Sequence, residues 1–259
     1  MGLVRAGIAL GVTLVLSAGC GRERGEAVRV VGSTSILPFA KMLAEEFNRN
    51  NPAIRVEVQG GGSTAGIQAL ADGAAEIASC SRTLKPEETG FTAVPIARDR
   101  IAIVVNLANK VNNLTLAQVR DIYEGKITNW HDVGGDDKAI TLITREEGSG
   151  TREAFERLAM PEARIARSAV TCNSSDAVKA RGKSDPGAIA YLSSALVRGE
   201  LKAVAVDGVE VLNSKYPLVR PFLFVVKGTP SEATQKFIDF VLSPPAQSIL
   251  EKEGLVRAK

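Results

Sequence analysis

Short apolar segments alternate with amphipathic ones along most of the chain. Residues 28–31 form an apolar run typical of a buried strand, and apolar residues over 37–47 recur on one face of a predicted helix. Residues 54–58 alternate apolar and polar side chains, which predicts a second strand, and a helix follows through Ile67 and Leu70. Residues 75–79 predict a third short strand.

The alternation of strands and helices continues further along the chain. Residues 100–106 and 139–145 are apolar runs typical of buried strands, and amphipathic helices are expected over 114–125 and 151–159. Residues 221–228 predict one more strand, and two helices broken at Pro244-Pro245 follow it. Strands that alternate with helices at this spacing predict an α/β architecture with mostly parallel sheets.

The first twenty residues carry a different pattern. Arg5 precedes an apolar run from Ala6 to Leu16, which is typical of an export signal and too short to span a bilayer. The run closes on LSAGC, which resembles the lipobox of bacterial lipoproteins and implies lipidation of Cys20; a simple cleaved secretory peptide is the alternative. We expect residues 1–19 to be the signal peptide and residues 20–26 a lipidated tether. The mature chain would then lie outside the cytoplasm, attached to a bacterial membrane by acyl chains such as palmitate.

Composition narrows the function classes. The formal charge is only +3 and no dense Lys/Arg block occurs, which argues against a nucleic-acid partner. The hydrophobic fraction of 45% can supply a sizeable core, in one large domain or two smaller ones. Cys80 and Cys172 lack the spacing of a metal or redox site, so we expect no metal and no cofactor. We interpret them as two buried thiols, with a single disulfide as the alternative.

Three predicted strand-to-helix turns combine glycine with hydroxyl residues, at 32–35, 62–64 and 148–151. The start of a helix exposes unpaired N–H donors, glycine permits close backbone approach, and Ser/Thr add O–H donors. Ordinary N-capping also explains any one of these turns. Because three occur together, and Arg82 and Arg145 can contribute bidentate guanidinium groups, the turns predict an oxyanion-binding site.

Several segments resemble the phosphate-binding proteins of phosphate-specific ABC transporters. The segments that carry this resemblance are GSTSILPFAKMLAEEFNRNNP, GGGSTAGIQAL, DIYEGKITNWHDVGG, REEGSGTREAFE, DPGAIAYLS and VKGTPSEATQKFIDFVLSPPAQ. The resemblance covers nearly all of the mature chain, and GKITNW and R-x-x-GSGT are its most specific parts.

This resemblance implies a type II periplasmic-binding-protein fold with two α/β lobes and two hinge crossings. One lobe would comprise residues 27–104 plus 223–259, and the other residues 105–222. The implied function is binding of inorganic phosphate between two closing lobes and its delivery to the permease of an ABC importer, without catalysis. We expect the protein to act as a monomer.

The anion-binding positions of the family fall on the predicted turns. The candidate ligand-binding residues are Thr34, Ser35, Ser63, Thr64, Ser81, Arg82, Arg145, Glu147, Ser149, Gly150 and Thr151. The best-known members have an aspartate after the third strand, where this chain has Arg82. That aspartate accepts the proton of hydrogen phosphate. Sulfate has no such proton, so it would leave two acceptor groups facing each other unpaired and is rejected. We hypothesise that Glu147 is the replacement acceptor; a solvated loop carboxylate is the alternative.

An enzyme is a first alternative function, because Ser63 or Ser149 lies in a turn of the kind that exposes a nucleophile. A Ser-His-Asp arrangement would need His131, the single histidine, and neither GxSxG nor HExxH occurs. We interpret His131 as a structural or surface residue and Trp130 as part of the core.

A dinucleotide-binding domain is a second alternative, since Gly60, Gly62 and Ala65 fit GxGxxG/A between a strand and a helix. The acidic residue expected at the ribose position does not follow, and a GxxxxGK[ST] loop does not occur. A third alternative is the same fold binding sulfate or molybdate, or acting as a sensor or adhesin.

Overall fold

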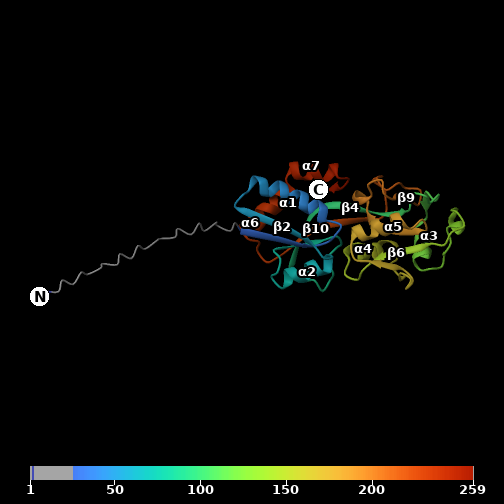
Figure 1. Ribbon diagram of the computed structural model, residues 1–259, viewed down its shortest axis with the longest axis horizontal. Helices are drawn as coiled ribbons and strands as arrows, with labels where there is room; N and C mark the ends of the chain where they lie inside the picture. Colours follow the sequence, from blue (N-terminus) through green and yellow to red (C-terminus); the bar gives the residue numbers. More distant parts are fainter. Residues whose placement is uncertain (1, 3–25, 259) are drawn as a thin grey trace.

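The computed structural model describes residue 2 and residues 26–258. The predicted signal peptide, apart from residue 2, and Cys20 lie outside the described residues. Figure 1 shows residues 26–258 as two lobes side by side, with β4 (Phe91–Val105) and β10 (Val219–Lys227) passing between them.

Each lobe contains strands and helices in alternation. Besides parts of β4 and β10, the first lobe contains β1 (Glu26–Gly32), α1 (Leu37–Asn50), β2 (Ile54–Gly60), α2 (Ser63–Ala71), β3 (Ile77–Cys80), α6 (Glu232–Leu242), α7 (Pro244–Lys252) and β11 (Val256–Arg257). The second contains β5 (Asn113–Leu114), α3 (Leu116–Tyr123), the 3-10 helix η1 (Trp130–Val133), β6 (Thr141–Arg145), α4 (Gly150–Ala159), β7 (Val170–Cys172), α5 (Ser175–Ser184), β8 (Ala188–Ser193) and β9 (Lys202–Val206). The 3-10 helix η2 (Ser194–Leu196) follows β8 in the chain, but its Ala195 and Leu196 pack in the core of the first lobe.

The sheets of the two lobes are continuous through β4, in the order β2-β1-β3-β10-β4-β8-β6-β7. β1 runs parallel to β2 and β3, and β6 runs parallel to β7 and β8. β10 is antiparallel to β3 and β4, and β4 is antiparallel to β8. The predicted parallel sheets are therefore mixed, because β4 and β10 pass between the lobes in opposite directions.

Both crossings lie close to the Arg100–Val219 pair, at which the pairing between β4 and β10 ends on the side of the second lobe. Phe91 to Arg100 of β4 pair with β10, whereas Ile101 to Val105 pair with β8. Ile101 and Ile103 pack in the core of the second lobe, and Phe222 packs in that of the first. Core membership therefore changes near residues 100 and 219, a few residues before the predicted boundaries at 104/105 and 222/223.

Each sheet is covered on both faces, which explains the short apolar runs of its strands. In β10, Phe222 and Phe224 pack with α1, α6 and α7, while the intervening Leu223 and Val225 pack with α2. The same alternation in β4 sends Ile103 toward α3 and α4 and Val104 toward α5. The helices therefore lie on both faces of each sheet, and the carboxyl ends of the parallel strands face the boundary between the lobes.

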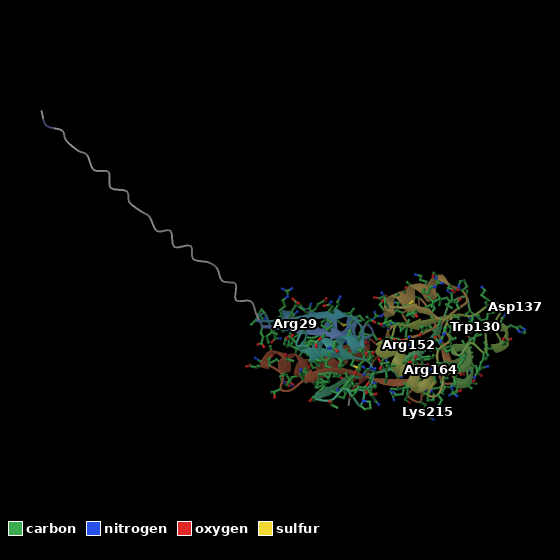
Figure 2. All side chains as sticks on the ribbon, turned by 90° about the horizontal axis from the view of Figure 1, so that it is seen from below. Arg29, Trp130, Asp137, Arg152, Arg164 and Lys215 are labelled. Atoms are coloured by element: carbon green, nitrogen blue, oxygen red, sulfur yellow. The ribbon has the colours of Figure 1, made fainter. Side chains whose placement is uncertain are left out.

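Several isolated predictions are confirmed. Cys80 and Cys172 are buried free cysteines, and burial raises the pKa of both thiols. Trp130 is 1% exposed in the core of the second lobe, and His131 has a side chain 77% exposed on its surface. Figure 2 shows Trp130 at the end of the second lobe that faces away from Arg29 in the first. Within residues 26–258, helices long and apolar enough to cross a membrane are absent.

Candidate functional site

Four strands and the helices that follow them meet where the two lobes face each other. β1 and β2 of the first lobe lead into α1 and α2, and β6 and β7 of the second lead into α4 and α5. Open α/β sheets bind ligands at the carboxyl ends of their strands, where loops and helix starts project past the sheet edge. The predicted turns at 32–35, 62–64 and 148–151 all lie at this place.

Hydroxyl groups from the two lobes are in direct contact there. The Ser35 and Thr151 hydroxyl oxygens are 2.7 Å apart, and the Thr34 and Ser175 hydroxyl oxygens are 3.4 Å apart. Within the first lobe, the hydroxyl oxygens of Ser63 and Ser81 are also 3.4 Å apart. Apart from Thr34, which is half-buried, these side chains are buried, with Ser63 and Ser81 0% exposed. A hydroxyl both donates and accepts, so the group can rearrange around an oxyanion.

The helices of the two lobes begin differently. Ser149 and Ser174 cap α4 and α5, because their hydroxyls accept from the Arg152 and Ala177 amides. In contrast, α1 and α2 begin at caps without a side-chain hydrogen bond, at Ile36 and Gly62. Ser149 therefore behaves as an ordinary N-cap. At the starts of α1 and α2 backbone carbonyls take this place, because the Leu37 amide donates to the Ser33 carbonyl and the Thr64 amide to the Gly148 carbonyl.

Arg145 ends β6 and is 2% exposed. Its amide donates to the Tyr191 hydroxyl at 3.2 Å, and burial raises the pKa of Tyr191 to about 12, so that this anchor stays neutral. Its guanidinium Nη2 donates to the Thr34 hydroxyl at 3.1 Å, across the lobe boundary. Among the residues that the structure describes, Nη1 reaches only the Ser175 hydroxyl, at 3.5 Å. Nη1 is therefore a donor beside the hydroxyl cluster with one long hydrogen bond.

A buried ion pair lies beside the cluster where β4 and β10 cross. Arg220 Nη2 and Asp99 Oδ2 are 2.8 Å apart, with both side chains 0% exposed. Burial raises the pKa of Asp99 and lowers the pKa of Arg220, and their mutual attraction opposes both shifts. Arg220 Nη1 donates to the Thr151 hydroxyl at 2.8 Å, and the Ser193 hydroxyl donates to Asp99 at 2.7 Å. The pair therefore connects the hinge to the hydroxyl cluster.

The lobes approach most closely at Gly150. A Cβ atom on this residue would lie 2.2 Å from Ser63 Oγ and 2.7 Å from Ser81 Oγ, both in the other lobe. The Thr64 amide also donates to the Gly148 carbonyl at 3.1 Å across the same boundary. The conformation described is therefore a closed one, and glycine at position 150 is what permits this approach.

Comparison with known proteins identifies the family of this chain. A family model described as "PBP superfamily domain" matches residues 20–245. The phosphate-binding protein PstS of Bacillus subtilis is 31% identical over 249 residues, covering 91% of this chain and 82% of its own length. This chain belongs to the PBP superfamily and, within it, to the family of the phosphate-binding protein PstS.

Solved structures of the family have the same fold. A protein from Clostridium perfringens, solved with bound phosphate, is 40% identical, with a TM-score of 0.87 over 90% of this chain and 100% of its own. An ABC-type phosphate transport receptor from Vibrio cholerae is 36% identical, with a TM-score of 0.74 over 88% of this chain and 99% of its own. The two-lobed α/β architecture implied by the sequence is confirmed.

Arg82 lies at the lobe boundary, but its guanidinium is paired with two carboxylates. Nη1 and Nη2 donate to Glu88 at 2.8 and 2.7 Å, and Nε lies 2.9 Å from Glu153 of α4. Nη2 also reaches the Thr64 hydroxyl at 3.4 Å. This differs from the expectation that Arg82 and Arg145 face the same oxygens. The loop after β3 brings Glu88 back to Arg82, and the approach of the lobes brings Glu153 to it.

Glu147 is exposed and lies on the outer side of α4, beside Arg152 and Arg164, away from the hydroxyl cluster. Its neighbour Glu146 instead accepts from Arg145 Nη2 and Nε at 2.7 and 2.8 Å. The turn at residues 146–149 directs the two side chains apart, so the carboxylate that pairs with Arg145 is that of Glu146 and not that of Glu147, the hypothesised acceptor. Figure 2 shows Arg152 and Arg164 on the second lobe.

The sequence analysis did not identify two parts of the site. Ser175 follows a strand and starts a helix, as the other turns do, but its turn lacks glycine and its strand has only 3 residues. The Asp99–Arg220 pair has no local signal, because its members lie in two strands 121 positions apart. A search for hydroxyl pairs at every strand-to-helix junction would have found Ser175.

Proposed function

We propose that this protein binds inorganic phosphate between its two lobes outside the cytoplasm and delivers it to the permease of an ABC importer. The observation that carries the proposal is the buried cluster of hydroxyls and Arg145 beside the starts of α1 and α2. A tetrahedral oxyanion has four oxygens, and backbone amides, hydroxyls and a guanidinium are the donors that suit it. The names of the relatives in Bacillus subtilis and Vibrio cholerae support phosphate as the anion.

The proposed mechanism is closure without a covalent step. Phosphate would contact Ser35 and Ser63 from one lobe and Arg145 and Thr151 from the other, and so favour the closed state over the open one. His131 does not support an enzyme, because its side chain is 77% exposed beside Asp132 rather than beside Ser63 or Ser149.

Titration calorimetry on residues 21–259 with phosphate, sulfate and molybdate tests the proposal. We expect phosphate to bind most tightly. Ser35→Ala should weaken its binding, whereas Ser184→Ala should not, since the Ser184 hydroxyl is exposed and donates only to the Arg181 carbonyl. Heat from sulfate or molybdate with none from phosphate would refute the proposed ligand.

Selectivity for phosphate over sulfate requires a group that accepts the proton of hydrogen phosphate. We propose Glu146 as this group, because its carboxylate holds Arg145 at 2.7 Å and lies 3.6 Å from the Cβ position of Gly62 in the other lobe. Glu146→Gln should reduce the ratio of phosphate to sulfate affinity, and the adjacent Glu147→Gln is the matched control. Equal ratios in wild type and Glu146→Gln would reject the assignment.

The LSAGC segment supports a lipid anchor at Cys20, with residues 1–19 removed. We propose that acyl chains hold the mature protein at the outer face of a bacterial membrane. Growth with radiolabelled palmitate should label the wild type and leave Cys20→Ser unlabelled. Equal labelling of both would place the lipid elsewhere.

A further inference from the structure

Glu153 of the second lobe is held entirely by groups of the first lobe. Its Oε2 lies 2.9 Å from Arg82 Nε and 3.1 Å from Lys85 Nζ. Its Oε1 accepts from the Thr64 hydroxyl at 3.3 Å. One carboxylate on α4 therefore joins three side chains across the lobe boundary, beside the hydroxyl cluster but apart from it.

The first-lobe side of this contact is preformed. Arg82 has a side chain 3% exposed and keeps a bidentate pair with Glu88, which belongs to the same lobe. The Lys85 amide also donates to Glu88 at 2.7 Å, which fixes the loop after β3. Opening of the lobes would leave Arg82 paired and return Glu153 to water. The contact with Glu153 is therefore made in the closed state alone.

A contact that exists in one of two conformations shifts the equilibrium toward that conformation. The Glu153 side chain is 21% exposed, so its pairing is shielded from solvent more than an ordinary surface ion pair is. We propose that Glu153, with Arg82, Lys85 and Thr64, is an interlobe latch that slows phosphate release without contacting phosphate. Glu153 is in this sense a positioning residue, and the proposal rests on the proposed function.

The same helix offers a matched control. Glu156 lies one turn further along α4 and pairs with Arg152 at 2.9 Å, within the second lobe. Glu153→Gln and Glu156→Gln each remove one negative charge from α4 at nearly constant shape. They differ in whether the lost ion pair crosses the lobe boundary.

The test measures loss of radiolabelled phosphate from the protein after dilution into excess unlabelled phosphate. Glu153→Gln should release phosphate about tenfold faster, with an association rate changed less, because a closed-state contact acts mainly on dissociation. Raising the ionic strength should speed release from the wild type more than from Glu153→Gln. Glu156→Gln should release phosphate within about twofold of the wild-type rate.

Two further measurements separate the latch from other effects. Lys85→Met should speed phosphate release when it is introduced into the wild type. The same substitution should speed release less when it is introduced into Glu153→Gln, since Lys85 and Glu153 belong to one contact. X-ray scattering of the ligand-free protein should show a more open average for Glu153→Gln than for Glu156→Gln. Equal release rates and equal scattering for the two variants would overturn the latch, whereas absence of phosphate binding by the wild type would overturn the proposed function instead.

Discussion

The Ser35 hydroxyl lies 2.7 Å from the Thr151 hydroxyl, although 116 positions separate the two residues. Ser35 belongs to the turn before α1 and Thr151 to the first turn of α4, so this hydrogen bond joins the two lobes. Arg220 donates to the same Thr151 oxygen at 2.8 Å from the hinge. The Thr151 hydroxyl thus joins the first lobe, the hydroxyl cluster and the crossing strands.

Loss of either hydroxyl should weaken phosphate binding. A hydrogen bond to a charged group contributes about 1.5–3 kcal/mol, so Ser35→Ala and Thr151→Val should each raise the Kd for phosphate at least about tenfold. Titration calorimetry measures this change. A Kd within about twofold of the wild type in both variants would show that these hydroxyls do not bind the anion.

A methyl group at position 150 should block closure. In Gly150→Ala the new Cβ would meet Ser63 Oγ at 2.2 Å in the closed state and nothing comparable in an open one. We expect phosphate affinity to fall at least about tenfold, because overpacking costs about 1–3 kcal/mol. The melting temperature without phosphate should stay unchanged or rise slightly, since alanine favours helix more than glycine. A large loss of stability without phosphate would mean that the methyl group disrupts a lobe rather than closure.

Removal of one partner of the buried hinge pair should destabilise the fold. Asp99→Asn leaves the Arg220 guanidinium buried without its carboxylate, which should lower the free energy of unfolding by about 3–5 kcal/mol. Urea unfolding measures the loss. Glu124→Gln, which removes one of the two carboxylates that pair with the exposed Lys126, should change the free energy of unfolding far less. Equal effects of the two substitutions would contradict this account of the hinge.

The first lobe should lose stability in acid through Glu88. Burial by itself would raise the pKa of this carboxyl, but the hydrogen bonds from Arg82 and the Lys85 amide outweigh it and hold the pKa below its ordinary value. A lowered folded-state pKa stabilises the fold above the unfolded pKa of about 4.3, and the contribution is lost as pH falls through the folded value. Unfolding free energies measured from pH 7 to pH 3 should therefore fall less steeply in Glu88→Gln. The exposed Glu87→Gln should keep the wild-type slope.

Strands and helices with a strong apolar period were predicted from the sequence, whereas several elements that lack such a period were missed. β1, α1, β2 and the pair α6 and α7 formed where apolar patterning and Pro244-Pro245 indicated. The first half of β4 was missed because residues 91–100 mix exposed and buried positions and contain Pro95, whose partner strand shifts register nearby. β7 and β9, at 3 and 5 residues, are too short to carry a clear period.

The sequence by itself determined the α/β class, the position of the glycine- and hydroxyl-containing turns and the family, because helix starts, glycine positions and apolar runs are local features. Only the tertiary structure decided which polar groups meet. It paired Arg82 with Glu88 and Glu153, turned Glu146 rather than Glu147 toward Arg145, and brought Asp99 to Arg220. The packing of the two lobes and the conformation of the loops determine these pairs. Such contacts join positions far apart in the chain or depend on a single turn, and no local pattern encodes them.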